Sequence, residues 1–485
     1  MSRGQRPGKS PARRPDESPG RRPDQGSAGI SFGISAGISA GSSHDAAAAG
    51  ERAETRAVVE AARRASRVLA TLADVTRNRA LEAMAAALEP AAAPLLNANA
   101  EDLRAAAESL SPATLARLQL SQAKLAEMAE QVRSVAGLPD PLGRVLDAIE
   151  LDEGLHLTRV SVPLGVVGVI FEARPDAVTQ IAALAVKSGN AVILKAGREV
   201  EETASVLVQV LRSALESCGL PADAVSLLRG RERAQELLAM HDLVDLMIPR
   251  GSKALVEYVQ ANTRIPVLGH AEGICHIYVD QRVDEALALR VIADAKMDYP
   301  AACNAVETVL VHQAIAAEFL PRLAEHLRAR GVVLHGDATV RGLLRGFEVE
   351  AITDWHTEYG EPAISLGVVA SLEDAIRHIH AHGSAHTESI LSSDPEAAEK
   401  FLREVDASSV MHNASTRFAD GFRYGFGAEV GISTSKLHAR GPVGLEGLTT
   451  YKFLLRGTGQ VAGDYRADKE TGRTARTFTH RRERG

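Results

Sequence analysis

The chain has 485 residues, which is enough for two or three domains with full hydrophobic cores. Its net charge of −7 argues against a general nucleic-acid partner, and no run approaches the roughly eighteen apolar residues of a membrane span. Three widely spaced cysteines, Cys218, Cys275 and Cys303, form neither a disulfide framework nor a CxxC metal motif and fit a reducing compartment. The basic N-terminus lacks the apolar segment of a secretory signal, so we expect a soluble cytoplasmic protein.

Both ends of the chain have the composition of loose tails. Residues 1–46 are rich in Arg, Pro, Gly and Ser and cannot bury enough apolar surface to order themselves, so we predict a disordered N-terminal tail. Residues 464–485 alternate charged residues with Thr and Gly, and we predict a second disordered tail there. Basic tails can also touch nucleic acid or an acidic partner, which is the alternative to a solvated end.

The region between the tails begins with helices. Residues 47–136 are rich in Ala, Leu and Arg, and residues 57–72 and 78–88 have the periodicity of amphipathic helices.

From residue 160 onward the chain alternates between strand and helix patterns. The predicted strands are residues 160–171, 191–194, 225–228, 243–248, 275–279 and 306–311, and the predicted helices are residues 176–188 and 200–218. Strands that alternate with helices predict an α/β protein with a parallel, doubly wound sheet. Ligands bind such sheets at the carboxyl ends of the strands.

Cys303 lies on an uncharged loop of small residues just before the strand predicted at residues 306–311. Pro300 ends any preceding helix and fixes the entry into the turn. A thiol on such a loop can meet a substrate while the strand behind it holds its position. The alternative is a small buried hydrophobic residue, which is the role of most free cysteines.

Three strand ends carry candidate binding groups. The loop with Glu172 and Arg174 leads into a helix whose free N–H groups suit an anion, although a local ion pair is the alternative. Lys195 can reach the ribose or phosphate of a dinucleotide, although it can also be an ordinary solvated lysine. Gly251 and Ser252 can approach a pyrophosphate, and helix capping alone explains them equally well.

Four histidines, His378, His380, His382 and His386, lie close together in the sequence. His378 and His382 have the i, i+4 spacing of a helical metal-binding pair, but no carboxylate or thiol nearby completes a ligand set. We therefore predict no metal site and assign these histidines hydrogen-bonding roles.

Asn413, Ser415 and Arg417 form a polar group that precedes the Gly-x-Gly segment at residues 425–427. An arginine among polar side chains and flexible glycines suits a clamp on a small anionic substrate.

Taken together and in this order, these segments resemble the γ-glutamyl phosphate reductases (glutamate-5-semialdehyde dehydrogenases). These enzymes are the proline-biosynthetic branch of the aldehyde dehydrogenase superfamily. The most distinctive likeness is a histidine-rich signature, met here by residues 369–390. The other segments that carry the resemblance are residues 162–170, 172–175, 187–194, 248–251, 275–280, 303–308, 413–418 and 437–442.

The resemblance implies an aldehyde dehydrogenase-like α/β fold with three parts. These are a doubly wound cofactor-binding domain (residues 47–137 and 159–281), a catalytic domain (residues 282–440) and a small β oligomerisation hairpin (residues 138–158 and 441–463).

The resemblance also implies an activity, the NADPH-dependent reduction of γ-glutamyl phosphate to glutamate-5-semialdehyde with release of phosphate. Cys303 is then the nucleophile that forms a thioester, and its backbone N–H is one oxyanion donor, with the second donor unassigned. Arg198 is a candidate partner for a 2′-phosphate, but the sequence does not decide between NADPH and NADH.

The roles that the resemblance implies for single residues follow its motifs. Substrate binding falls to Arg174, Asn304, Asn413, Ser415 and Arg417, and cofactor binding to Lys195, Gly251, Ser252 and Glu361. Glu361 takes the position of the superfamily's nicotinamide-ribose carboxylate, and Lys195 that of its adenosine-ribose lysine. Gly269 takes the position of the glutamate base with which oxidising aldehyde dehydrogenases activate water, as suits an enzyme that releases phosphate instead.

The partners implied are the small-molecule substrate γ-glutamyl phosphate and further copies of the chain in a homo-oligomer, with no nucleic acid and no membrane. Residues 1–46 are too short for a glutamate kinase domain, so a separate glutamate 5-kinase is expected to supply the substrate, by transient contact or by free diffusion. Two alternatives to this function stay open: an oxidising aldehyde dehydrogenase acting on another semialdehyde, and a catalytically silent homologue. The intact Cys303 loop argues against the second.

Overall fold

The computed structural model describes residues 41–110, 112–467 and 469–482. It divides into two units, residues 1–49 and residues 50–485, and all of the sheets belong to the second. The predicted N-terminal tail lies outside the described residues as far as residue 40. Residues 41–46 begin helix α1 (Gly41–Leu69), so the helix starts before the predicted end of the tail.

Helices precede the first sheet, as the Ala-rich composition predicts. They are α1, α2 (Asp74–Leu88), α3 (Ala92–Ala106), α4 (Pro112–Leu118) and α5 (Gln122–Ala136). The two predicted amphipathic helices correspond to α1 and α2, although α1 ends at Leu69 and not at residue 72. Leu81, Met84 and Leu88 of α2 recur at three- and four-residue spacing and are fully buried, in a core shared with the first of the two parallel sheets.

The first parallel sheet has the strand order β5-β4-β3-β6. Its strands are β3 (Val166–Phe171), β4 (Ala191–Ala196), β5 (Val225–Leu227) and β6 (Leu246–Arg250). The accompanying helices are α6 (Asp176–Lys187), η1 (Arg198–Val200), α7 (Glu201–Ser217), η2 (Ala222–Ala224), α8 (Glu232–Ala239) and α9 (Lys253–Asn262). The chain steps outward from β3 to β5 and returns to β6 on the other side of β3, so the predicted doubly wound arrangement is confirmed.

Two strand predictions need correction. Strand β6 begins at Leu246, three residues later than predicted, because residues 241–243 form a turn. The predicted single strand at 160–171 is two strands in two different sheets, β2 (Leu155–Pro163) and β3. The chain breaks between them at Gly165, whose φ of 129° is open only to glycine and whose N–H donates to the Asn190 side chain at 2.7 Å. The residues on both sides of this break are apolar and β-branched, so the sequence pattern does not reveal it.

The second parallel sheet has seven strands in the order β10-β9-β11-β8-β7-β12-β13. They are β7 (Cys275–Val279), β8 (Val306–His312), β9 (Val333–Gly336), β10 (Glu350–Ala351), β11 (Ala363–Val369), β12 (Thr387–Leu391) and β13 (Ser409–His412). The helices are α10 (Glu285–Met297), α11 (Gln313–Arg328), α12 (Ala338–Leu343), α13 (Leu372–His382) and α14 (Pro395–Glu404).

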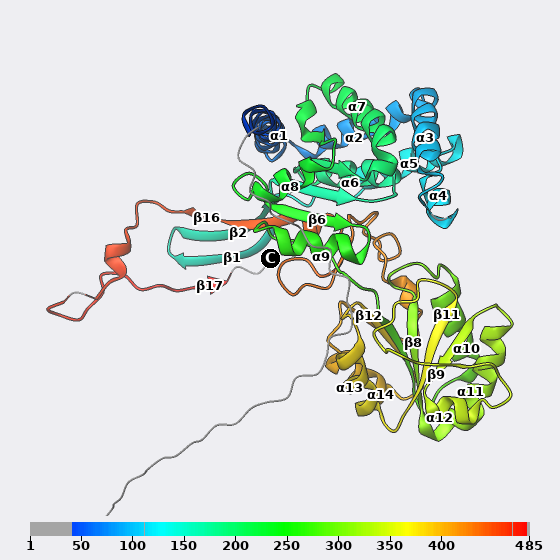
Figure 1. The fold of residues 1–485 in the computed structure, drawn as a ribbon. Helices are drawn as coiled ribbons and strands as arrows, with labels where there is room; N and C mark the ends of the chain where they lie inside the picture. The colour runs from blue at the N-terminus through cyan, green and yellow to red at the C-terminus, as the bar shows by residue number, and fades with distance from the viewer. Residues whose placement is uncertain (1–40, 111, 468, 483–485) are drawn as a thin grey trace, which may run out of the picture. The chain divides into compact units, whose positions relative to one another are not determined.

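Helices cover both faces of this seven-stranded sheet. Figure 1 shows α10, α11 and α12 on one side of it and α13 and α14 on the other. Alternate residues of β7 supply the two cores, since Ile277 packs with the first group of helices and Tyr278 with the second. A strand buried on both faces reads as a continuous apolar run, which is why β7 and β8 are predicted correctly from the sequence.

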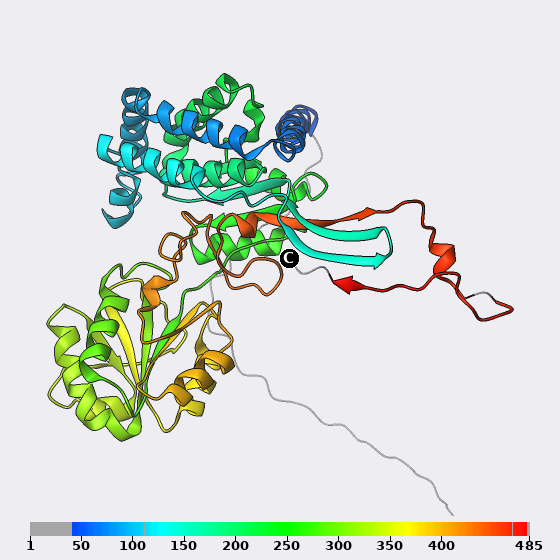
Figure 2. The same ribbon diagram turned by 180° about the vertical axis from the view of Figure 1, so that it is seen from behind.

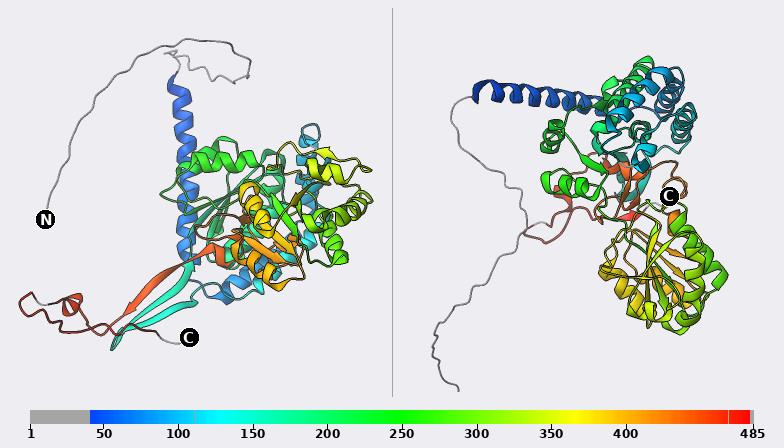
Figure 3. Two further views of the ribbon diagram at one scale, coloured as in Figure 1. Left: turned by 90° about the horizontal axis from the view of Figure 1, so that it is seen from below. Right: turned by 45° about the vertical axis from the view of Figure 1, so that its right-hand side comes forward.

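A four-stranded antiparallel sheet joins segments from distant parts of the chain. Its order is β16-β2-β1-β17, with β1 (Val145–Asp152) and β16 (Thr449–Arg456) beside β2, and Figures 2 and 3 show β16 along the β1–β2 hairpin. This is the predicted hairpin element. A small pair, β14 (Ile432–Ser433) with β15 (Gly441–Pro442), precedes it, followed by η4 (Glu446–Leu448).

The predicted C-terminal tail is not loose over its described residues. After η5 (Ala462–Tyr465) the chain returns to the hairpin, where β17 (Arg481–Arg482) pairs with β1. The rings of Tyr465 and Phe478 stack with centroids 4.2 Å apart. The sequence prediction missed this because charged and small residues can form an edge strand when a partner strand supplies the hydrogen bonds.

No helix among the described residues combines the length and the apolar character needed to cross a membrane.

Candidate active site

A cleft of about 620 Å³ gathers most of the predicted site residues. The carboxyl ends of β3 and β6 and the start of α9 form one wall, as the rule for open α/β sheets predicts. The facing wall comes from the loops that precede β7, β8 and β11. The seven-stranded sheet therefore contributes its amino edge, contrary to the sequence-based expectation that ligands meet the carboxyl ends of its strands.

Cys303 lines this cleft on the loop predicted to carry it, and it is half-buried. Two tight turns shape the loop, since Ala302 N donates to Tyr299 O at 3.1 Å and Ala305 N donates to Ala302 O at 2.9 Å. Gly273 lies directly against the Cys303 backbone, and a Cβ there would be 2.1 Å from the Cys303 carbonyl oxygen. Only a glycine at residue 273 leaves the thiol-bearing loop in this position.

Two histidines accompany the thiol. Cys303 Sγ and one ring nitrogen each of His270 and His386 lie within 4.8 Å of one another. His270 Nδ1 is 2.9 Å from the carbonyl oxygen of Ile432 and therefore donates to it, which leaves Nε2 as the basic nitrogen. Burial lowers the pKa of His270, so the ring is neutral at physiological pH.

His270 is not among the functional residues predicted from the sequence, and His386 is predicted only as a member of a histidine cluster. No sequence spacing links residues 270, 303 and 386, because three separate loops bring them together. The other members of that cluster lie elsewhere: His378 and His382 pack around Trp355, with ring centroids 4.6 and 6.3 Å from it.

Arg417 and Asn304 lie at the cleft but are bound to each other. Arg417 donates to the Asn304 side-chain oxygen and, at 3.0 Å, to Asp298, while Asn304 donates to Ala419 O at 2.8 Å. Asp298 also accepts from Arg423 at 2.8 Å, and its hydrogen bonds to Arg423 and Arg417 lower its pKa. This network ties the start of the Cys303 loop to the segment at 417–423, so both predicted substrate-binding residues also hold the loop.

Asn413 and Ser415 do not line the cleft. Asn413 follows β13 at the opposite, carboxyl edge of the seven-stranded sheet, where its side chain accepts from Ser392 N and donates to Ser392 O. Ser415 is buried and caps η3 (Thr416–Phe418) by accepting from Arg417 N. The structure therefore gives these two residues structural contacts away from the thiol.

The opposite wall carries Glu172, Gly251 and Ser252. Ser252 caps α9 through its side chain, as predicted, and its N–H donates to Glu172 Oε2 at 2.9 Å. A Cβ on Gly251 would come within 2.3 Å of the same oxygen, so the backbone approaches this side chain as closely as it can. The N–H groups at the start of the ten-residue helix α9 face the crevice between β3 and β6.

Two arginines give this part of the cleft a positive charge. Arg174 and the half-buried Arg250 both line it, and burial together with Arg174 lowers the pKa of Arg250. Burial raises the pKa of Glu429, a lining carboxyl, and the nearby Arg250 opposes that rise. Arg174 is predicted from the sequence, whereas Arg250 is not, because it lies at the end of a strand like many structural residues.

Lys195 and Glu361 lie outside the lining of the cleft. Lys195 is buried at the carboxyl end of β4, where its amino group donates to Ala196 O and burial lowers its pKa. Glu361 is exposed on the loop before β11, whereas Glu358, three residues earlier on that loop, lines the cleft. Glu358 is not predicted from the sequence, because either acidic residue of this loop can turn toward the cleft.

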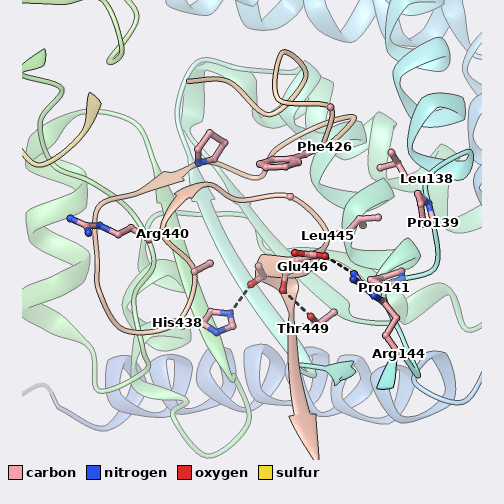
Figure 4. A pocket seen from close by; sticks show the side chains of 15 residues that line it. Leu138, Pro139, Pro141, Arg144, Phe426, His438, Arg440, Leu445, Glu446 and Thr449 are labelled. Atoms are coloured by element: carbon pink, nitrogen blue, oxygen red, sulfur yellow. Dashed lines mark hydrogen bonds and ion pairs between the residues drawn. The ribbon is translucent and has the colours of Figure 1, made fainter. Parts of the chain in front are cut away.

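A second cavity, of about 570 Å³, lies where residues 138–144 meet residues 425–449 (Figure 4). Arg144 pairs with Glu446 there, and His438 is 2.7 Å from the Gly447 carbonyl oxygen. The Arg440 guanidinium points away from the other labelled side chains in Figure 4 and binds Asp406 at 2.9 Å. None of the predicted site residues lines this cavity, so the Cys303 cleft is the candidate active site.

Comparison with known proteins identifies the family of the chain. The model of the aldehyde dehydrogenase family matches residues 39–340. A gamma-glutamyl phosphate reductase of Cyanothece sp. (strain PCC 7425) is 55% identical over 420 residues, which are 86% of this chain and 96% of that protein. The chain belongs to the aldehyde dehydrogenase family, in its gamma-glutamyl phosphate reductase group.

Further relatives support the same assignment. The gamma-glutamyl phosphate reductase of Acaryochloris marina is 52% identical over 426 residues, covering 87% of this chain and 97% of that protein. The crystal structure of gamma-glutamyl phosphate reductase from Thermotoga maritima superposes with a TM-score of 0.82 at 38% identity, covering 84% of this chain and 99% of that one. The expected aldehyde dehydrogenase-like α/β fold is confirmed, and the chain is an oxidoreductase of this family.

Gly269 has space for a side chain in the Cys303 cleft. An added Cβ would have Pro249 Cγ as its nearest neighbour at 3.5 Å, an ordinary contact, and the residue lines the same cleft as Cys303. Nothing steric therefore requires glycine at residue 269.

Proposed function

We propose that this protein reduces γ-glutamyl phosphate to glutamate-5-semialdehyde with NADPH and releases phosphate, as a step of proline biosynthesis. The observation that carries the proposal is a half-buried thiol, Cys303, in one cleft with two arginines. Gly269, which we propose to stand where an oxidising enzyme has its hydrolytic base, lines the same cleft. The names of the relatives support the same substrate and reaction.

The first step is attack of the Cys303 thiolate on the acyl carbon of γ-glutamyl phosphate. His270, which has a ring nitrogen within 4.8 Å of Sγ, takes the thiol proton through Nε2, because Nδ1 donates to Ile432 O. A C–S bond forms, the C–O bond to phosphate breaks, and phosphate leaves with its electron pair. The Cys303 N–H is one donor to the carbonyl oxygen as negative charge develops on it.

Arg174 and Arg250 are proposed to bind the phosphate of the substrate. Two guanidinium groups match phosphate oxygens, and among the described residues neither side chain forms a hydrogen bond within the protein. Arg417 and Asn304 are proposed to hold the Cys303 loop and to border the substrate. Asn413 and Ser415 are not retained as substrate contacts, because their hydrogen bonds lie away from the cleft.

The crevice between β3 and β6 fits a nicotinamide dinucleotide. Ser252 caps α9, and the first N–H groups of the helix that neither Ser252 Oγ nor Glu172 occupies are proposed to bind the pyrophosphate. When bound, NADPH supplies the hydride for the reduction of the thioester. Collapse of the resulting thiohemiacetal frees the aldehyde and returns the thiol, and the protein's own donors orient the acyl group throughout.

Glu358 replaces Glu361 in our assignment of the carboxylate that binds the nicotinamide ribose, because Glu358 lines the cleft and Glu361 does not. Lys195 stays a candidate for the adenosine ribose at the carboxyl edge of β4, and Arg198 for a 2′-phosphate. We further propose that the enzyme acts in the cytoplasm, forms a homo-oligomer and receives its substrate from a separate glutamate 5-kinase.

The phosphate dependence of the reverse reaction tests this function. Glutamate-5-semialdehyde and NADP⁺ are incubated with the protein, with and without inorganic phosphate, and NADPH formation is measured. We expect turnover only when phosphate or arsenate is present, because Gly269, at the position proposed for the hydrolytic glutamate, has no side chain that could activate water. Turnover without either anion would identify an oxidising aldehyde dehydrogenase, and failure to bind any nicotinamide cofactor would identify a silent homologue.

A further inference from the structure

Cys303 lies close to two potential metal ligands from distant parts of the chain. Sγ of Cys303 and one ring nitrogen each of His270 and His386 lie within 4.8 Å of one another. His270 comes from the loop before β7, and His386 immediately precedes β12. No metal site is predicted from the sequence because no thiol lies near the histidines there, and the fold supplies that thiol.

His386 has a buried nitrogen without a partner. Its side chain has an exposed fraction of 0%, and its Nδ1 is 2.8 Å from Thr387 Oγ1. Among the described residues, nothing forms a hydrogen bond with its Nε2. Buried polar atoms are nearly always satisfied, so this nitrogen points to a ligand that completes its surroundings.

His270 is oriented in the way that metal-binding histidines usually are. Its Nδ1–H donates to the Ile432 carbonyl oxygen at 2.9 Å, which fixes the ring and leaves the lone pair on Nε2. A neutral imidazole held by a backbone carbonyl is the common form of a zinc-binding histidine.

We propose that Cys303, His270 and His386 bind one Zn²⁺ ion, with a water molecule as the fourth ligand. Thiolate and imidazole are the ligands that Zn²⁺ prefers, and three protein ligands with one open position are typical of accessible zinc sites. Zn–S and Zn–N bonds of about 2.3 and 2.0–2.1 Å place tetrahedral ligand atoms roughly 3.5 Å apart, so the side chains close by about 1 Å on binding. Rotation of the half-buried Cys303 side chain provides that movement.

Zinc binding and acyl transfer exclude each other at this site. The sulfur lone pair that attacks the substrate is the one that binds the ion, and His270 Nε2 cannot take a proton while it binds zinc. Zn²⁺ therefore inhibits the enzyme reversibly and shields the thiol. This inhibition rests on the proposed function, whereas the binding of the ion does not.

Co²⁺ titration of the full-length protein, without substrate or cofactor, tests the site. Co²⁺ replaces Zn²⁺ in such sites, and a thiolate ligand gives an intense sulfur-to-cobalt charge-transfer band in the near ultraviolet. We expect one equivalent to bind with this band, and excess Zn²⁺ to remove it. Cys303→Ser should abolish the band, His270→Gln and His386→Gln should each weaken binding at least about tenfold, and Cys218→Ser should change nothing.

Two results would overturn the proposal. One is a charge-transfer band that survives in Cys303→Ser but disappears in Cys275→Ala, since Cys275 Sγ lies 3.7 Å from His386 Nδ1 and is the other thiol near this point. The second is the absence of any thiolate band in the native protein at saturating Co²⁺. If His386→Gln fails to fold, as judged by far-ultraviolet circular dichroism, the more exposed His270→Gln decides the histidine contribution.

The inhibition is tested separately on the enzyme. Micromolar Zn²⁺ should suppress the phosphate-dependent reverse reaction and a chelator should restore it, with the half-maximal concentration matching the affinity from the cobalt competition. A protein that binds Co²⁺ with the band but has no reductase activity keeps the metal site and overturns the proposed function. Full activity at zinc concentrations that saturate the site would overturn the inhibitory role.

Discussion

At the residue scale, a buried ion pair supports the element behind Cys303. Lys296 on α10 and Glu307 on β8 are both almost fully buried, and Lys296 Nζ lies 2.7 Å from Glu307 Oε2. Burial raises the pKa of Glu307 to about 7, and the ammonium group of Lys296 opposes that rise. Each charge is tolerated in the core because the other is present.

Removal of one partner should therefore be costly. We expect Glu307→Gln to lower the free energy of unfolding by about 3–5 kcal/mol, because it leaves the Lys296 ammonium buried without a counter-charge. Urea denaturation measures the loss, and the double variant Lys296→Met, Glu307→Gln should recover part of it. As a matched control, Glu373→Gln breaks the exposed pair with Lys400 and should cost less than about 1 kcal/mol. An equal loss in both single variants would contradict the account of the buried pair.

The buried His378 should make the free energy of unfolding depend on pH. Burial lowers its pKa to about 3, and the neighbouring His276, His382 and His356 contribute in the same direction. In the unfolded chain the His378 side chain is protonated below pH 6.5, whereas in the folded protein it stays neutral down to about pH 3. Stability is therefore full above pH 6.5 and falls as the pH drops through that window, by at most about 1.4 kcal/mol per pH unit for one proton.

Denaturation curves at several pH values between 7 and 4 measure this slope. The variant His378→Gln should show a shallower fall than the native protein, because its side chain does not titrate. Parallel curves for the two proteins would show that other groups cause the acid sensitivity.

At the scale of elements, two glycines of one loop offer a matched comparison. An added Cβ at Gly273 would meet the Cys303 carbonyl oxygen at 2.1 Å, whereas at Gly269 it would meet only Pro249 at 3.5 Å. We expect Gly273→Ala to displace the Cys303 loop and lower kcat about 100-fold, with the fold retained. Gly269→Ala should leave kcat within a few-fold of the native value. Steady-state kinetics measure kcat, and circular dichroism shows whether each variant keeps its fold. Similar losses of kcat in both variants would contradict the close packing of Gly273 on the Cys303 loop.

The sequence predicts the elements better than the site. Strands such as β7 and β8 are continuous apolar runs with a clear start and end, so their bounds are predicted to within a residue. The break at Gly165 is hidden because the residues around it favour a strand in either sheet. Cys303 can be predicted from the sequence of its own loop. His270 and Arg250 reach the site only because separate loops meet in the fold, and no local sequence pattern indicates those contacts.

The errors in the predicted site have the same cause. Asn413 and Ser415 follow a strand of the correct sheet but at its other edge, and a single sequence does not reveal which edge faces the cofactor domain. Glu361 and Glu358 stand three residues apart, and only the turn of the loop decides which one lines the cleft.

At the scale of the whole molecule, the antiparallel sheet presents an apolar face. Tyr451, Phe453 and Leu455 alternate along β16 and are 50–59% exposed. Exposed apolar stripes of this kind mark protein interfaces, and we expect a second copy of the chain to cover this one.

Analytical ultracentrifugation tests this assembly. The variant Phe453→Ser, Leu455→Ser should shift the protein toward the monomer, because it removes apolar area without touching the parallel sheets. Val75→Ser, which changes an exposed apolar residue of α2, serves as the control and should not alter the mass. Equal masses for all three proteins would contradict an interface on β16.

The most direct test of the account compares the cysteines in the reverse reaction at saturating phosphate. Cys303→Ala and Cys218→Ala are assayed for NADP⁺ reduction with glutamate-5-semialdehyde, and their binding of NADP⁺ is measured in parallel. The account predicts that Cys303→Ala loses at least about 1,000-fold in kcat while it still binds the cofactor, and that Cys218→Ala matches the native enzyme. Substantial turnover in Cys303→Ala would show that the thiol does not carry the acyl group and would contradict the mechanism.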